Sequence, residues 1–220
     1  MKRMIPLLLA AAFIVGGAVF LMMPSGQSSM PQLGAANAQA VESVEELNIA
    51  DMTLGAEDAP VTIIEYASFT CPHCRTFHEG PFKALKADYI DTGKVQFVYR
   101  EVYFDRFGLW ASMIARCGGD ERFFGITDLI YDQQRSWTQG APAEIAENLR
   151  TIGLTAGLSA EEIDACFSDG DKAQSLVSWY EANAAADNVR STPTFIIDGV
   201  QHSNMSLSEF REIIDAKIDG

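Results

Sequence analysis

The hydrophobic and polar positions of the chain predict a strand, a helix and a second strand in its first half. Residues 61–67 are rich in β-branched side chains, as expected of a buried strand. A helical pattern runs from 72 to about 90, and Gly80-Pro81 is expected either to kink this helix or to end it. Thr92-Gly93 closes the pattern, and residues 95–99 read as a second strand. The three segments predict a β-α-β unit with parallel strands.

Helical periodicity dominates the middle of the chain, from about residue 106 to residue 187. A capping box, Ser159-Ala160-Glu161-Glu162, marks one helix start within it. The pattern is interrupted at four places: 118–119, 140–142, 153–157 and 168–170. We therefore expect a helical subdomain of four or five short helices.

Strand character returns near the end of the chain, at residues 194–197. Asp198-Gly199 is a strong signal for a two-residue hairpin before Val200. A last helix is capped at Ser206 and places Phe210, Ile213, Ile214 and Ile218 on one face. The order β-α-β, helical insert, β-β-α predicts an α/β fold, and the chain has no internal repeat.

The first 40 residues are expected to be an export signal or a membrane anchor with a linker. Met1-Lys2-Arg3 precedes an apolar stretch at 4–23. A polar stretch of small residues follows and ends in Ala38-Gln39-Ala40, a small-x-small sequence typical of a signal cleavage site. The apolar stretch is long enough to span a bilayer, and the cleavage site lies well beyond its end. Both cleavage and retention therefore remain open. The segment at 41–60 is too short for a further domain and ends in a turn.

The charge of the chain is strongly acidic. Residues 1–40 hold two of the 16 Lys and Arg residues and none of the 30 Asp and Glu residues, so residues 41–220 carry a formal charge of −16. This charge argues against a nucleic-acid partner, and we expect partners to be met through apolar contacts. Hydrophobic residues make up 48% of the chain, which is ample for a core.

The motif Cys71-Pro72-His73-Cys74 carries the candidate chemistry. Two thiols at this spacing can form and reopen a disulfide by thiol–disulfide exchange, in which the thiolate is the nucleophile. We expect Cys71 to be half exposed at a strand-to-helix junction. There, backbone N–H groups, the helix dipole and His73 favour the thiolate. Cys74 lies one turn further, faces inward and acts as the resolving thiol.

A structural zinc site is the alternative interpretation of this spacing. Such a site requires a second pair of ligands, yet Cys117 and Cys166 are far apart in the sequence and neither has a Cys or His at ligand spacing. We expect no metal. No organic cofactor is implied either, because the electrons reside in the cysteine pair.

Three parts of the chain resemble one known family. They are Ile64-Glu65-Tyr66-Ala67-Ser68-Phe69-Thr70 before the motif, the Pro-His pair within it and Thr192-Pro193 near the later strand. The family that they resemble is the DsbA-like thiol:disulfide oxidoreductases of the bacterial cell envelope. The resemblance covers roughly residues 55–220. It implies a thioredoxin fold with a central mixed sheet and an inserted all-helical subdomain. The expected domain boundaries are 41–105 and 189–220 for the two halves of the thioredoxin domain and 106–188 for the insert.

The resemblance also implies roles for single residues. Pro193 matches a cis-proline beside the active site, although the sequence alone allows a trans residue that opens a strand. Thr192 matches the residue whose backbone can pair with substrate. Glu65 matches a buried carboxylate that handles protons for the resolving cysteine, and a solvated glutamate at the strand end is the alternative.

Two positions depart from the best-known oxidase of this family. Thr192 stands where that oxidase has valine and is more similar to the isomerases and reductases of the superfamily. His78 stands where oxidases often carry an acidic residue. We expect His78 to lie on an exposed helix face, where most histidines have no role.

Cys117 and Cys166 are expected to form a structural disulfide within the insert, as in some DsbA-like proteins. The alternative is two buried free thiols. The tryptophans of the insert, Trp110, Trp137 and Trp179, are expected in its core, where they would report on the redox state.

The leading functional hypothesis is a periplasmic oxidase that donates the Cys71–Cys74 disulfide to reduced or unfolded exported proteins. A membrane oxidant similar to DsbB would reoxidise it, and we expect a monomer. It would be soluble after signal cleavage or tethered by residues 4–23. An isomerase or reductase that is kept reduced by a membrane partner is the alternative. A metal-delivery or chaperone module without catalytic activity is the alternative from another class.

Overall fold

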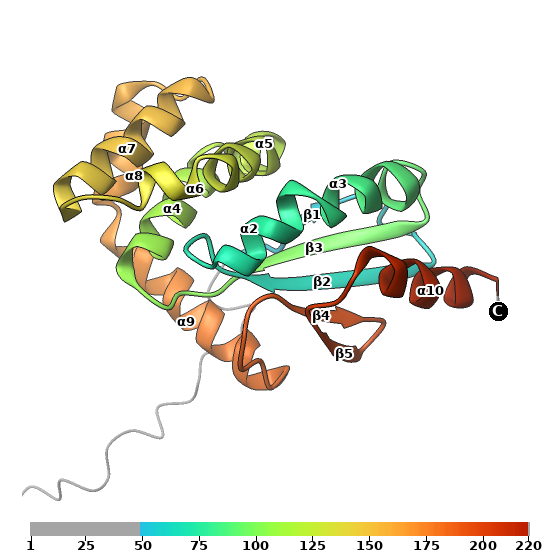
Figure 1. Cartoon of the computed structure of the whole chain (residues 1–220). Coiled ribbons are helices and arrows are strands. Elements are labelled where there is room, and N and C mark those ends of the chain that lie inside the picture. The colour runs from blue at the N-terminus through green and yellow to red at the C-terminus, as the bar shows by residue number, and fades with distance from the viewer. Residues whose placement is uncertain (1–48, 220) are drawn as a thin grey trace, which may run out of the picture. The chain divides into compact units, whose positions relative to one another are not determined.

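The computed structural model describes residues 49–219, and its centre is a sheet of five strands (Figure 1). The strand order is β1-β3-β2-β4-β5. The strands span Met52–Leu54 (β1), Val61–Ala67 (β2), Val95–Glu101 (β3), Thr194–Ile197 (β4) and Val200–Ser203 (β5). β2 and β3 are parallel, whereas β1, β4 and β5 each pair antiparallel with their neighbour. The expected mixed sheet of a thioredoxin fold is therefore confirmed.

The strand β1 was not predicted from the sequence. It has three residues, and it pairs with β3 through the register Met52↔Tyr99. A segment this short carries no periodic signal, and only its neighbour in the sheet makes it a strand.

The connection between β2 and β3 follows the prediction closely. It consists of α2 (Pro72–Glu79), α3 (Pro81–Leu85) and the π-helical turn η1 (Lys86–Ile90). Pro81 has no N–H group to continue the first helix, so the chain kinks at Gly80, whose N–H donates to the Phe77 carbonyl.

The insert contains six helices, rather than the expected four or five. They are α4 (Arg106–Cys117), α5 (Gly119–Asp132), α6 (Gln134–Trp137), α7 (Pro142–Thr155), α8 (Ala160–Ser168) and α9 (Gly170–Ala186). Four of the five breaks between these helices lie where glycine, proline or serine interrupts the pattern. They are the breaks α4–α5, α6–α7, α7–α8 and α8–α9. The break between α5 and α6 has no such marker.

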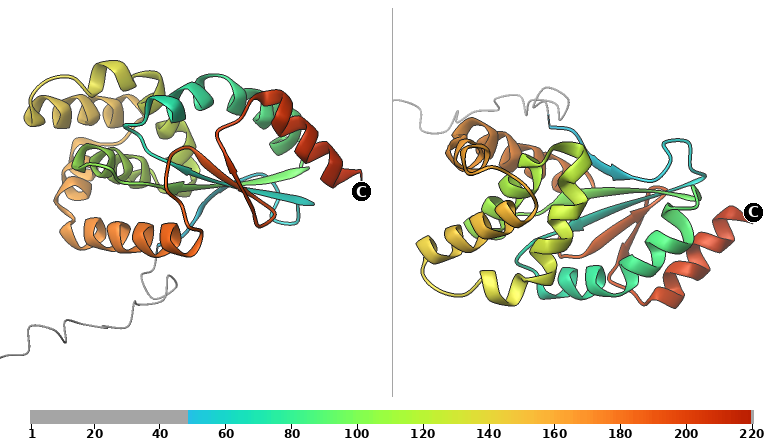
Figure 2. Two further views of the ribbon diagram at one scale, coloured as in Figure 1. Left: turned by 60° about the horizontal axis from the view of Figure 1, so that its bottom comes forward. Right: turned by 90° about the horizontal axis from the view of Figure 1, so that it is seen from above.

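The helices lie on both faces of the sheet (Figures 1 and 2). On one face, Phe77 of α2 and Phe210 of α10 (Leu207–Ile218) pack against Phe195 of β4, with ring centroids 4.8 Å from Phe195 in both cases. On the other face, the Tyr66 hydroxyl donates to the Asn183 carbonyl of α9. Side chains alternate between the two faces of the sheet along β2 and β4, so these strands contribute to a hydrophobic core on each face.

The apolar stretch at 4–23 and the expected cleavage site lie outside the described residues. Within residues 49–219, no helix combines the length and the apolar character that crossing a membrane requires.

Candidate active site

Cys71 lies where β2 passes into α2. The Cys71 N–H donates to the Ser68 carbonyl at 3.0 Å, so the chain turns tightly after β2, and Pro72 begins the helix with its fixed φ angle. The residue was expected to be half exposed, and this is wrong. Only 8% of Cys71 is exposed, because the loop that contains Thr192 covers its sulfur, and Sγ lies 3.4 Å from the Thr192 carbonyl oxygen.

The surroundings of Cys71 stabilise its thiolate. A hydrogen bond from the Cys74 thiol is the largest cause that lowers its pKa, from 9.0 to about 5, and burial opposes it. The backbone N–H groups of Cys74 and His73 add to the effect. The side chain of His73 is exposed, so His73 contributes through its backbone rather than through its imidazole.

The surroundings of Cys74 shift its pKa in the direction opposite to that of Cys71. Its side chain is fully buried, and burial raises its pKa well above 9.0. The hydrogen bond to Cys71 and the charge of Glu65 raise it further. In this structure both cysteines are free, so it describes the dithiol form. One thiol of the pair is thus prepared for attack and the other holds its proton.

Glu65 and His78 form a hydrogen-bonded pair in the core beside the cysteines. Glu65 Oε2 and His78 Nε2 lie 2.8 Å apart, and both side chains are almost fully buried. The His78 ring stacks on Tyr131 at a centroid distance of 4.4 Å. Burial raises the pKa of Glu65, and His78 partly counteracts this effect. The expected buried carboxylate is present, whereas the expectation of an exposed His78 is wrong.

The sequence contains a signal that would have placed His78 correctly. His78 follows Cys74 by four residues on α2, and residues four apart share one face of a helix. Because Cys74 was expected to face inward, His78 was bound to do the same.

The loop before β4 lies against the sulfur of Cys71. The Thr192–Pro193 peptide bond is cis, as the resemblance implied. The Thr194 hydroxyl donates to the Ser191 carbonyl at 2.7 Å, and Phe195 anchors the following strand in the core. This arrangement brings Thr192 to Cys71 across 121 positions of sequence.

The helical insert holds the motif loop from a third direction. Gln134 Nε2 donates to the Phe69 carbonyl at 2.7 Å and to the Cys71 carbonyl at 3.0 Å, and its side chain is buried. The Tyr131 hydroxyl donates to the Ser68 carbonyl. Sequence reasoning missed both residues, because no local pattern links them to a motif more than 60 positions away.

The remaining cysteines, Cys117 and Cys166, form a disulfide that joins the end of α4 to α8. It lies within the insert and is separate in the chain from the motif at residues 71–74. The structure therefore divides the four cysteines into a redox-capable pair and a cross-link, as the sequence predicted.

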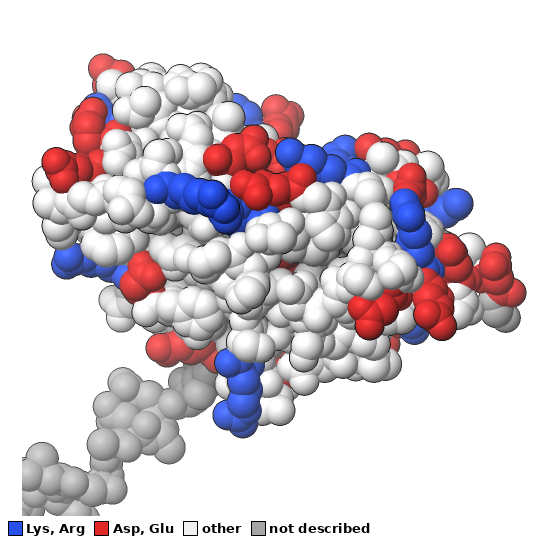
Figure 3. All heavy atoms as spheres, viewed as in Figure 1, with Lys and Arg blue, Asp and Glu red and all other residues white. Residues whose placement is uncertain are grey.

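Figure 3 shows how charge is distributed around this site. Acidic and basic side chains alternate along the upper edge and around α10. The surface between the start of α2 and the start of β4 is mostly uncharged on this face.

The chain was compared with known proteins. The family described as Thioredoxin matches residues 47–216. A Rickettsia bellii protein named "Putative protein-disulfide oxidoreductase" is 36% identical over 170 residues, which are 77% of this chain and 65% of that protein. "Disulfide bond formation protein D" of Bacillus subtilis is 26% identical, over 76% of this chain and 77% of that protein. The chain thus spans just under two thirds of the length of the Rickettsia relative.

Solved structures agree with these matches. The crystal structure of alpha-DsbA1 from Wolbachia pipientis has a TM-score of 0.73 and 27% sequence identity, and the match covers 80% of this chain and 96% of that one. The fold, the helical insert and the Cys-Pro-His-Cys motif beside a cis-proline all agree with the resemblance to DsbA-like proteins. The chain belongs to the thioredoxin family, and within it the chain is DsbA-like.

Proposed function

We propose that this protein is a thiol:disulfide oxidase that donates the Cys71–Cys74 disulfide to reduced or unfolded exported proteins. The observation that carries the proposal is the opposite displacement of the two thiol pKa values, downward for Cys71 and upward for Cys74. The similarity to named disulfide oxidoreductases supports it.

The pKa of Cys71 favours the direction of oxidation. A pH of 7 is two units above a pKa of about 5, so the Cys71 thiolate stabilises the dithiol by about 3 kcal/mol relative to an unperturbed cysteine. This corresponds to a couple that is about 60 mV more oxidising, since 30 mV equals about 1.4 kcal/mol for two electrons. The protein is therefore expected to give up its disulfide readily.

The reaction proceeds in two exchanges. A substrate thiolate attacks Sγ of Cys71, the Cys71–Cys74 bond breaks, and Cys74 leaves and takes up a proton. The second substrate thiolate then attacks the substrate sulfur of the mixed disulfide and releases the Cys71 thiolate. Two substrate thiols lose two electrons and two protons. The cysteine pair gains the electrons, Cys74 keeps one proton, and the other goes to solvent.

Glu65 is placed to handle the proton of Cys74. Its charge raises the pKa of Cys74, so the two groups interact, and its Oε2 atom lies 2.8 Å from Nε2 of His78. Glu65 therefore offers a buried proton-accepting group to the thiol of Cys74, which has no exposed surface.

We place the protein in the bacterial periplasm, exported by residues 1–40 and either released or tethered by residues 4–23. A DsbB-like membrane protein that passes electrons to a quinone is the proposed oxidant, and the active form is proposed to be a monomer. These assignments rest on the sequence of the first 40 residues and on the family.

A reductase or isomerase is the second candidate, and Thr192 favours it. The hydroxyl of Thr192, beside the cis-proline, has no hydrogen-bond partner among the described residues, so it can donate to a bound substrate, whereas valine cannot. The contact changes how tightly a mixed disulfide is held and therefore which substrates are released.

The reduction potential of the couple tests the proposal. The protein is equilibrated in glutathione buffers, and tryptophan fluorescence is followed, with Cys71→Ser as the blank. Trp137 suits this readout because it shares α6 with Gln134, which binds the Cys71 carbonyl. A potential well above that of thioredoxin supports the oxidase, and a thioredoxin-like value supports the reductase.

A further inference from the structure

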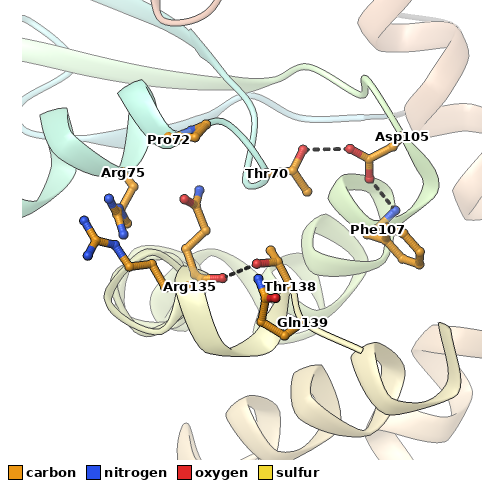
Figure 4. Close-up of a pocket in the computed structure, with 9 residues that line it drawn as sticks. Thr70, Pro72, Arg75, Asp105, Phe107, Arg135, Thr138 and Gln139 are labelled. Carbon is orange, nitrogen blue, oxygen red and sulfur yellow. Dashed lines mark hydrogen bonds between the residues drawn. The ribbon is translucent and has the colours of Figure 1, made fainter. Parts of the chain in front are cut away.

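A pocket opens beside the reactive cysteine and is not used by the exchange chemistry. It has a volume of about 600 Å³, and Thr70 and Pro72, the residues on either side of Cys71, form one wall (Figure 4). Phe107 at the start of α4 and Thr138 after α6 form the opposite walls. A side chain one or two residues from a substrate cysteine would reach this space when that cysteine is bonded to Cys71.

The charge inside the pocket is positive. Arg75 of α2 and Arg135 of α6 line it, together with one acidic residue, Asp105. The Asp105 carboxylate is already occupied: it accepts from the Thr70 hydroxyl at 2.8 Å and from the N–H groups of Phe107 and Gly108. In Figure 4 both arginines lie on the side of the pocket away from Asp105.

Arg75 is a cation that is buried without an adequate partner. Only 9% of its side chain is exposed, and its Nε donates no hydrogen bond to any described residue. The nearest carboxylate, Glu79, lies 3.7 Å from Nε and is 44% exposed. A buried guanidinium with an unused N–H group is costly, and a negative charge in the pocket that Arg75 lines would offset part of this cost.

We propose that this pocket binds the carboxylate of an acidic residue adjacent to the cysteine of a polypeptide substrate. Arg75 and Arg135 would donate to it, because the planar guanidinium matches a carboxylate in shape and charge. The proposal rests on the proposed function in that Cys71 delivers the substrate to the pocket. The charge of −16 on residues 41–220 repels acidic peptides at long range, but salt screens it beyond about 8 Å. The local arginines therefore decide the preference.

The test compares two reduced peptides that differ only in Glu or Gln beside the cysteine. Rates of oxidation by the oxidised protein are measured for the wild type, Arg135→Gln and Arg75→Gln. We expect the wild type to prefer the Glu peptide about five-fold, and each substitution to reduce this ratio toward one, as does 0.5 M salt. An unchanged ratio in both variants overturns the proposal.

Lys94→Gln is the matched control, since it removes the same charge from an exposed position. Lys94 precedes β3, whereas Cys71 follows the parallel strand β2, so the two lie at opposite ends of a seven-residue strand, about 20 Å apart. The control should keep the wild-type ratio. A loss of preference in this variant would mean that net charge rather than the pocket sets it.

A second measurement separates the pocket from the redox function. Both peptides are prepared with serine in place of cysteine and added to ¹⁵N-labelled protein, and the Nε–H signal of Arg75 is followed by NMR. The Glu peptide should shift this signal and the Gln peptide should not. Such a shift, together with no oxidation of the cysteine peptides in the rate measurement, would refute the oxidase alone, and the absence of a shift would refute the pocket.

Discussion

Replacing Cys71 by serine should change the pH dependence of stability in a defined way. The pKa of Cys71 is lowered to about 5 in the folded dithiol, first by the Cys74 thiol, and returns to an ordinary value of about 9 on unfolding. A group with a depressed folded pKa stabilises the fold above its unfolded pKa, and this contribution is lost as the pH falls through the folded pKa. The pH window is therefore 5 to 9.

The magnitude follows from the width of this window. Within it, the difference in unfolding free energy between the wild type and Cys71→Ser grows by about 1.4 kcal/mol per pH unit. At pH 7 the thiolate contributes about 2 kcal/mol more than it does at pH 5. Differences in packing between sulfur and oxygen shift all values equally, so the slope with pH is the informative quantity. Glu65 titrates in both proteins, and its contribution largely cancels.

The assay is urea unfolding of both proteins in the presence of a phosphine reductant at pH 5, 6, 7 and 8, followed by far-ultraviolet circular dichroism. Thiolate absorbance at 240 nm gives the pKa of Cys71 directly in the same samples. A difference between the two proteins that does not change with pH, or a thiolate transition above pH 8, would refute the reasoning. The proposed oxidising couple would then lose its physical basis.

Three further results are expected. Cys74→Ala should raise the pKa of Cys71 above about 5, because it removes the largest stabilising hydrogen bond, and the 240 nm titration measures the change. His78→Phe keeps an aromatic ring in the core but leaves Glu65 without its partner, so we expect a loss of about 1–3 kcal/mol, which a second substitution, Glu65→Leu, should largely restore in urea titrations. Replacing Cys117 and Cys166 by alanine should lower stability by about 4 kcal/mol, since the disulfide closes a loop with a sequence separation of 49, and a thermal midpoint that does not change would contradict this.

The sequence by itself determined the features that depend on residues close together in the chain. Cys71 and Cys74 are one helical turn apart, Gly80-Pro81 interrupts the helix that carries them, and Ser159 and Ser206 each accept a hydrogen bond from the N–H group three residues later. Each of these rests on backbone geometry within one or two turns, so the local pattern was sufficient to predict them. The family resemblance added the cis bond at Pro193, which local preference alone could not have shown.

Only the tertiary structure decided what surrounds the reactive thiol. Thr192 reaches Cys71 from the loop before β4, Gln134 holds its carbonyl from the insert, and Arg75 and Arg135 of separate helices line the same side of one pocket. These contacts arise when the hydrophobic faces of distant elements pack together, and that packing is not directional. A sequence pattern shows that a face will be buried but not which polar group will lie opposite to it.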